Sequence, residues 1–141
     1  MKPIVPCLWF DTEGEEAAKL YTSIVPNSRI TDVNAYGVSF ELNGQPYFAL
    51  NGGPQYRFSE AVSFQIFCET QEEVDRYWDA LGEGGEPGPC GWLKDRFGLS
   101  WQIVPARLTE LLSDPDRERA QRVAACMMQM GKLEIADLEA A

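Results

Sequence analysis

A short strand, a helix-capping pattern and an amphipathic helix occur twice in this chain, in the same order. Apolar residues 3–10 are followed by Thr12 and Glu15, and residues 61–69 by Thr70 and Glu73, and both pairs match a capping box. The apolar positions of the two helices recur with a spacing of 57 residues: Ala17, Leu20, Tyr21 and Ile24, then Val74, Tyr77, Trp78 and Leu81. The repeated pattern indicates an internal duplication.

Short runs rich in β-branched and aromatic residues follow each helix, which predicts further strands. In the first half they span 29–36, 38–42 and 47–51, and in the second half 88–92, 93–95 and 99–104, with a turn at 96–98. Each half is therefore predicted to be a βαβββ unit, one at 3–55 and one at 60–105, which gives an α+β fold. We expect the whole chain, 1–141, to be a single domain.

The last part of the chain, 106–141, lacks strand patterns and predicts C-terminal helices. Ser113 and Pro115 indicate a helix start. The apolar stripe that follows contains Ala120, Val123, Ala124, Met127 and Met130. A methionine-rich stripe is typical of a packing surface, so we expect this tail to dock on the domain or on a second subunit.

Composition excludes several classes of partner. The formal charge is −10 and the basic residues are scattered, which argues against nucleic acid. No apolar run is long enough to span a bilayer, and the N-terminal segment lacks the features of a secretory signal, so we expect no membrane association. The four cysteines form no CxxC pair, which favours reduced thiols and a cytoplasmic location.

Three segments resemble a known superfamily. They are "PCLWFDTEGEEAAKLYTSIVPNSRI", "FELNGQPYFALNGGPQYRFSEAVSFQIFCETQEEVDRYW" and "GPCGWLKDRFGLSWQIVP". They resemble the PhnB-like branch, labelled 3-demethylubiquinone-9 3-methyltransferase-like, of the vicinal oxygen chelate superfamily, which includes glyoxalase I and bleomycin-resistance proteins. The resemblance implies two βαβββ units with curled mixed sheets around a cleft, and a homodimer. One departure is the connection near Gly37, where members of the branch have a longer glycine-rich loop.

The resemblance also implies where a metal would bind. It places ligands of the enzymatic members at Ile4, Ala61, Ala49 and Gln102, of which only Gln102 has a donor oxygen. The chain contains no histidine, the commonest ligand of transition metals. We therefore expect no metal and no cofactor.

Strand alternation sorts the side chains of the predicted strands into two faces. Those expected to face the helices are Val5, Cys7, Trp9, Val62, Phe64, Ile66, Leu99, Trp101 and Ile103. Those expected to face the cleft are Ile4, Pro6, Leu8, Phe10, Ser63, Gln65, Phe67, Ser100 and Gln102. The second set is apolar with a few neutral polar groups, which is typical of a pocket for an uncharged small molecule. The alternative is that these side chains pack against one another in a closed core.

The segment 88–105 has the composition of an active site, with a cysteine, a lysine and an aspartate. Cys90 could act as a nucleophile only with a nearby base, and no histidine exists to serve. The neighbouring glycines are better explained as strand ends, and Trp92 as a wall of the cleft. We expect Asp95 and Arg96 to form an exposed ion pair. The candidate ligand-binding residues are Asn51, Ser63, Gln65, Phe67, Cys90, Trp92, Ser100 and Gln102.

Three functions are compatible with these patterns. The favoured hypothesis is a metal-free protein that binds a small molecule in the cleft. The alternatives are a glyoxalase-type lyase, isomerase or dioxygenase with an atypical metal site, and a structural dimerisation module. Methyl transfer from S-adenosylmethionine is not expected, because no glycine-rich turn links a strand to a helix as in the doubly wound fold.

Overall fold

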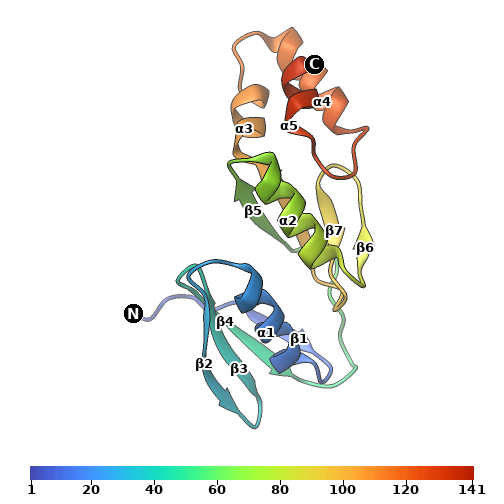
Figure 1. Ribbon diagram of the computed structural model, residues 1–141. Helices are drawn as coiled ribbons and strands as arrows, with labels where there is room; N and C mark the ends of the chain where they lie inside the picture. Colours follow the sequence, from blue (N-terminus) through green and yellow to red (C-terminus); the bar gives the residue numbers. More distant parts are fainter. The chain divides into compact units, whose positions relative to one another are not determined.

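The computed structural model describes residues 1–141 as two compact units, 1–58 and 59–141 (Figure 1). Each unit contains one four-stranded mixed sheet with a helix on one face, so the predicted α+β fold of two βαβββ units with C-terminal helices is confirmed. The predicted units, 3–55 and 60–105, lie within these two, and residues 106–141 belong to the second unit. That both units make one domain stays a prediction.

The first unit packs a helix against a sheet of strand order β1-β4-β3-β2, in which β1 is parallel to β4. The other pairs are antiparallel. The core lies between α1 and the sheet and includes Tyr21, Phe40 and Ala49. The elements are β1 (Cys7–Phe10), α1 (Gly14–Ile24), β2 (Arg29–Asn34), β3 (Gly37–Leu42) and β4 (Gln45–Asn51).

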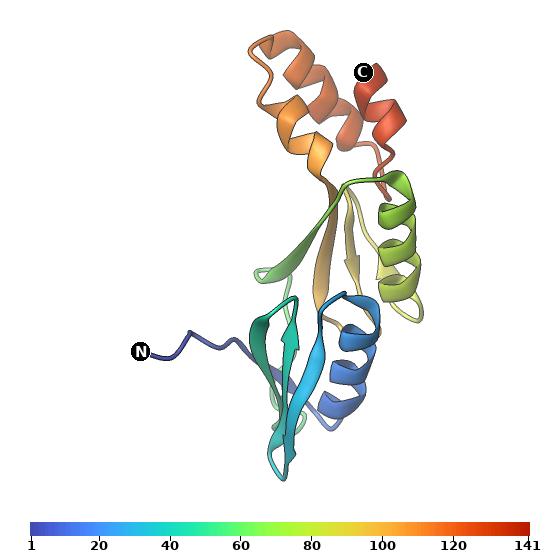
Figure 2. The ribbon, with the colours of Figure 1, turned by 60° about the vertical axis from the view of Figure 1, so that its left-hand side comes forward.

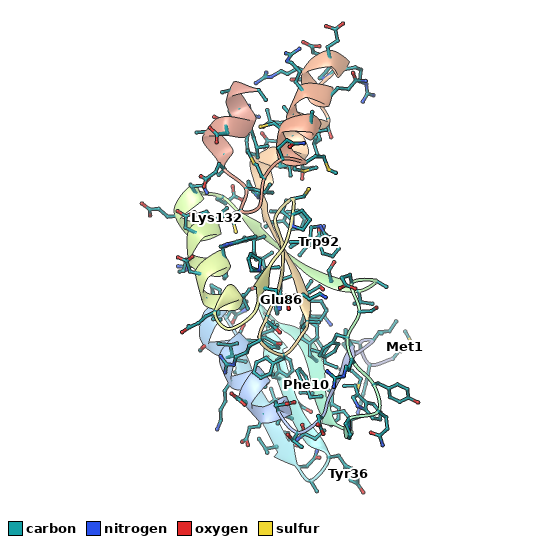
Figure 3. The ribbon with its side chains drawn as sticks, turned by 90° about the vertical axis from the view of Figure 1, so that its right-hand side faces the viewer. Met1, Phe10, Tyr36, Glu86, Trp92 and Lys132 are labelled. Atoms are coloured by element: carbon teal, nitrogen blue, oxygen red, sulfur yellow. The ribbon has the colours of Figure 1, made fainter.

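The short connection near Gly37 is a tight hairpin turn at 35–36, with Tyr36 labelled at its tip in Figure 3. Gly37 begins β3 and faces Leu50 of β4. A Cβ atom on Gly37 would overlap the carbonyl oxygen of Ala49, so the close approach of β3 to β4 requires glycine there.

The face predicted for the first strand is wrong. Leu8 and Phe10 are buried against the helix, whereas Cys7 is exposed and Trp9 is half-buried. Three residues, 11–13, connect β1 to α1, but only two, 69–70, connect β5 to α2. The two helices are therefore 57 residues apart in sequence, whereas the ends of the two strands are 58 apart. Because side chains alternate along a strand, this difference of one residue reverses the predicted faces of β1.

The extra residue also moves the start of α1. The predicted capping box of Thr12 and Glu15 does not form, because the N-cap is Glu13, which makes no capping bond with its side chain. The first amide of the helix, that of Gly14, instead donates to Asn51 Oδ1 at 2.8 Å.

The second unit repeats the plan with strand order β5-β8-β7-β6, in which β5 is parallel to β8. Here Thr70 caps the helix as predicted, since its Oγ1 accepts from the Glu73 amide at 3.2 Å, but the Glu73 carboxylate accepts from the Glu69 amide, one residue before the cap. The predicted faces hold for β5 and β8, where Phe64 packs edge-on against the buried Trp101. The elements are β5 (Ser63–Cys68), α2 (Gln71–Gly82), β6 (Glu86–Pro87), β7 (Trp92–Lys94) and β8 (Ser100–Pro105).

Two local predictions for this unit are wrong. Val62 precedes β5 and its side chain is 62% exposed instead of lying in the core. The strand expected at 88–92 is a turn in which Cys90 and Gly91 both have positive φ, of 57° and 84°. Their amides donate to the carbonyls of Met130 and Gly131, at 2.8 Å in both cases, so the turn is bonded to the C-terminal tail.

The tail continues from β8 as three helices, α3 (Ala106–Leu112), α4 (Arg117–Met127) and α5 (Ile135–Ala140), gathered at one end of the second unit (Figure 2). Asp116 caps α4, so the predicted start near Pro115 is close, and α3 precedes it within the predicted helical tail. Buried apolar residues join the tail to the end of β8: Val104, Leu108, Leu111, Val123, Leu133 and Leu138. The tail thus docks on its own unit. None of the helices combines the length and the apolar character that a membrane-spanning segment requires.

Gln71 of α2 anchors the loop before α5. Its Nε2 donates to the Leu133 carbonyl at 3.0 Å, and its Oε1 accepts from the Ile135 amide at 2.8 Å. The ion pair of Lys132 with Asp75, at 2.8 Å, reinforces this contact. The anchored loop holds Leu133 in place beside the turn at Cys90 and Gly91.

Burial of Cys68 at the end of β5 predicts a pH dependence of stability. Burial raises the pKa of the Cys68 thiol from 9.0 to about 11. Because the folded state then holds the proton more tightly, the stabilisation is complete below pH 9.0 and is lost as the pH rises through about 11. Urea unfolding should show a fall in stability from about pH 7 to about pH 10 that is smaller in Cys68→Ala. Equal falls in both proteins would contradict this role.

Candidate functional site

A pocket of about 780 Å³ lies in the second unit, on the face of the sheet opposite α2 and under the tail helices. The strands supply its floor, and α3 with the loop around Leu133 supplies a wall. The lining residues are Glu60, Gln65, Phe67, Glu86, Pro87, Gly88, Pro89, Cys90, Trp92, Leu93, Lys94, Ser100, Gln102, Val104, Leu108, Thr109, Leu112, Met127, Met128 and Leu133.

The end of the pocket next to the tail is apolar. Phe67 of β5 and Val104 of β8 occupy paired strands at this end, since β8 leads directly into α3. Trp92 lies nearer the tail helices than Glu86 does, as Figure 3 shows. The tail contributes most of the apolar surface here, through Leu108, Leu112, Met127, Met128 and Leu133.

Neutral polar side chains from β5 and β8 form a short hydrogen-bonded ladder on the pocket floor. Gln65 Nε2 donates to Gln102 Oε1 at 3.3 Å, and Gln102 Nε2 donates to Ser63 Oγ at 2.8 Å. The parallel register pairs Gln65 with Gln102, which holds the two amides side by side. Gln65 is exposed, so one of its amide hydrogens and its carbonyl oxygen remain open to a bound molecule.

Ser100 occupies the deepest polar position of the floor. Its side chain is 1% exposed, and its Oγ has no hydrogen-bond partner within the chain. It lies between Ser63 of β5 and Lys94 of β7 in the strand register. A buried hydroxyl without a partner is costly, because it has lost its bonds to water. A polar atom bound in the pocket would remove that cost.

Lys94 closes the polar end in an ion pair with Glu60. Their hydrogen bond raises the pKa of Lys94 and lowers the pKa of Glu60. Both groups therefore stay charged near neutral pH, and Lys94 cannot serve as a base. Glu86 faces Lys94 across β6 and β7 and adds a second carboxylate.

Cys90 lines the pocket, but its surroundings are structural. Its Sγ donates to Met128 Sδ at 3.6 Å, and its amide holds the tail loop through Met130. The lysine of the same segment is already paired with Glu60. No base is therefore placed to generate the thiolate that a nucleophile requires.

Asn51 is the predicted site residue that does not belong to the second unit. It belongs to the first unit, where its side chain caps α1 through the Gly14 amide. Ser63 does not line the pocket itself but supports Gln102. The structure brings together on the pocket lining the remaining predicted residues: Gln65, Phe67, Cys90, Trp92, Ser100 and Gln102.

The expectation that Asp95 is exposed is wrong. Asp95 is 3% exposed, and its Oδ1 accepts from the amides of Phe97 and Leu99 at 2.8 and 3.1 Å. Its Oδ2 accepts from Trp101 Nε1 at 2.9 Å. This carboxylate therefore organises the turn that leads into β8 and orients Trp101 away from the pocket.

The residues at the positions where the resemblance implies metal ligands do not suit a metal. Ala49 is fully buried beneath α1, and Ile4 and Ala61 have no donor atom. The amide of Gln102 is already hydrogen-bonded to Gln65 and to Ser63. No group of three His, Cys, Asp or Glu side chains converges on one point.

The family model described as 3-demethylubiquinone-9 3-methyltransferase matches residues 2–104, which include both sheets. The chain belongs to this family. The match ends at Val104, so the three tail helices lie outside it. Among the curated proteins, none matches this chain.

Solved structures agree with the assignment. A PhnB protein from Bacillus cereus is 29% identical, with a TM-score of 0.67, and all of it aligns with 74% of this chain. A protein from Pseudomonas aeruginosa is 19% identical, with a TM-score of 0.62, and 98% of it aligns with 74% of this chain. The fosfomycin resistance protein FosX from Mesorhizobium loti is 14% identical, with a TM-score of 0.58 and coverage of 80% of this chain and 99% of its own. These likenesses establish the glyoxalase/bleomycin-resistance fold.

Sequence reasoning missed the contribution of the tail to the pocket. It also missed Glu60, Glu86 and Lys94 as neighbours on its polar rim. The methionine-rich stripe signalled that the tail packs on something, but no local pattern indicates which face of the sheet it approaches.

Proposed function

We propose that this protein of the PhnB-like family binds a small uncharged molecule in the pocket of its second unit, without a metal. The observation that carries the proposal is Ser100 Oγ, a buried hydroxyl without a partner on the floor of a pocket whose walls are mostly apolar. Apolar walls with a few fixed polar groups are typical of ligand-binding sites. The open amide groups of Gln65 add a second polar contact.

Binding can be tested with N-phenyl-1-naphthylamine, an uncharged fluorescent amphiphile. We expect saturable binding at one site per chain, in the presence and in the absence of a chelator. Gln65→Trp should abolish it by filling the pocket from an exposed position, whereas Gln121→Trp, on the exposed surface of α4, should not. Absence of saturable binding, or equal binding by the two variants, would refute the proposal. Binding that requires one divalent ion per chain would instead favour a glyoxalase-type enzyme.

The proposal extends to a cytoplasmic homodimer. The resemblance to the family and the many aromatic and methionine side chains support association, since these residues are enriched at interfaces. Light scattering should report twice the chain mass of 15.8 kDa, and a single species of that mass would contradict the dimer.

A further inference from the structure

Polarity changes steadily along the pocket. On β8, Ser100 and Gln102 are followed by Val104, and on β5 Gln65 is followed by Phe67. Ser100 and Val104 lie about 13 Å apart at the usual rise of a strand. The pocket therefore has a polar end and an apolar end, separated by roughly the length of a medium alkyl chain.

The polar end has no free cation next to Ser100, and Glu86 adds a carboxylate that faces Lys94. Lys94 is held by Glu60, and the groups left open there, Ser100 Oγ and the Gln65 amide, are neutral. A carboxylate head would meet the carboxylates of Glu60 and Glu86, and an ammonium head would have to compete with Lys94 for them and lose its own water. An uncharged group such as a hydroxyl can both donate to and accept from Ser100 without disturbing this ion pair.

The apolar end is built mainly by the tail, which lies beyond the family match at 2–104. The wall formed by α3 and the loop around Leu133 therefore lies outside the segment that the family model matches. This wall would set how long an apolar chain the pocket accepts.

We propose, resting on the proposed function, that the pocket selects an elongated amphiphile. Its single uncharged polar head binds Ser100 Oγ, and its alkyl chain runs along β8 to end beneath α3. The ligand class is that of medium-chain alcohols and similar neutral amphiphiles, and the tail helices determine the chain length.

The test is displacement of N-phenyl-1-naphthylamine by primary alcohols from hexanol to dodecanol. Affinity should rise about 4-fold for each added methylene and then stop rising once the chain meets the tail. Alkanoates and alkylamines of equal length should bind at least about 10-fold more weakly, because their charge is desolvated. The proposal would be overturned if affinity did not rise with chain length even among the shortest alcohols. Tighter binding of an alkanoate or alkylamine than of the alcohol of equal length would also overturn it.

Two variants separate the head from the chain. Ser100→Ala should weaken binding of octanol about 5- to 10-fold but leave butylbenzene, which lacks a polar head, unchanged. Ser59→Ala, an exposed serine outside the pocket, is the control. Because Ser100 Oγ has no partner within the chain, its removal should not lower stability in urea unfolding. Unchanged octanol binding in Ser100→Ala would refute the role of the hydroxyl.

Thr109→Trp tests the wall, since Thr109 lines the pocket from the exposed side of α3. The chain length at which affinity stops rising should become shorter, while hexanol binding stays the same. Gln121→Trp should change neither. An unchanged length limit would refute the role of the tail. If the wild-type protein binds the fluorescent probe but shows no dependence on chain length, only this inference fails; if the probe itself does not bind, the proposed function fails.

Discussion

Replacement of Asp95 by alanine should lower the free energy of unfolding of the second unit by about 3 kcal/mol. The carboxylate is 3% exposed and accepts hydrogen bonds from the Phe97 and Leu99 amides and from the Trp101 indole. Its removal leaves three donors without this acceptor in a buried turn, and each such loss is costly. Urea unfolding followed by tryptophan fluorescence measures the change.

Asp95→Asn distinguishes the two halves of this network. The asparagine oxygen can still accept from the two amides, but its NH₂ group would face the indole N–H of Trp101, where two donors oppose each other. We expect a free energy of unfolding between that of the wild-type protein and that of Asp95→Ala. Asp79→Ala, an exposed aspartate of α2, should change the free energy by no more than about 0.5 kcal/mol. Equal effects of Asp79→Ala and Asp95→Ala would show that the network adds nothing.

Leu133→Ala should cost about 3 kcal/mol and loosen the tail. Leu133 is fully buried in the cluster that joins the tail to Val104, and it also lines the pocket. It packs so tightly on the turn at Gly91 that a Cβ there would lie 2.9 Å from Leu133 Cδ1. Truncation leaves a cavity where the neighbours cannot close in. Urea unfolding gives the free energy, and amide hydrogen exchange at the turn reports on the loosening.

Leu133→Met is the matched control, because it keeps nearly the same volume. We expect it to cost less than about 1.5 kcal/mol and to leave exchange at Cys90 and Gly91 protected. Their amides donate to the carbonyls of the tail loop, so protection depends on that loop staying in place. If alanine and methionine had equal effects, Leu133 would not hold the tail by packing.

The contrast between the two β-to-α connections explains why strand faces were predicted well in one unit and not in the other. The Thr70 N-cap marks the true start of α2, so alternation could be counted back correctly onto β5. In the first unit the cap is supplied by Asn51 from β4, and the sequence pattern at Thr12 is misleading. Since the side chains of a strand alternate, an error of one residue reversed the whole face.

Only the part of the candidate site that the strands contribute could be predicted from the sequence. Gln65, Phe67, Ser100 and Gln102 follow from strand alternation within the second unit, because that pattern is local. The burial of Asp95 did not follow, because a charged residue in a turn is usually exposed and only its bonds to Trp101 and the turn amides reverse that preference.

The amino-acid sequence by itself determined the duplication, the α+β architecture and the polar and apolar alternation of β5 and β8, since each depends on the periodicity of neighbouring residues. Only the tertiary structure decided what closes the pocket. Gln71 bonds to Leu133, 62 positions away, and this places the tail over the sheet. A contact between residues so far apart leaves no trace in local periodicity, because it depends on how separate elements pack after each has formed.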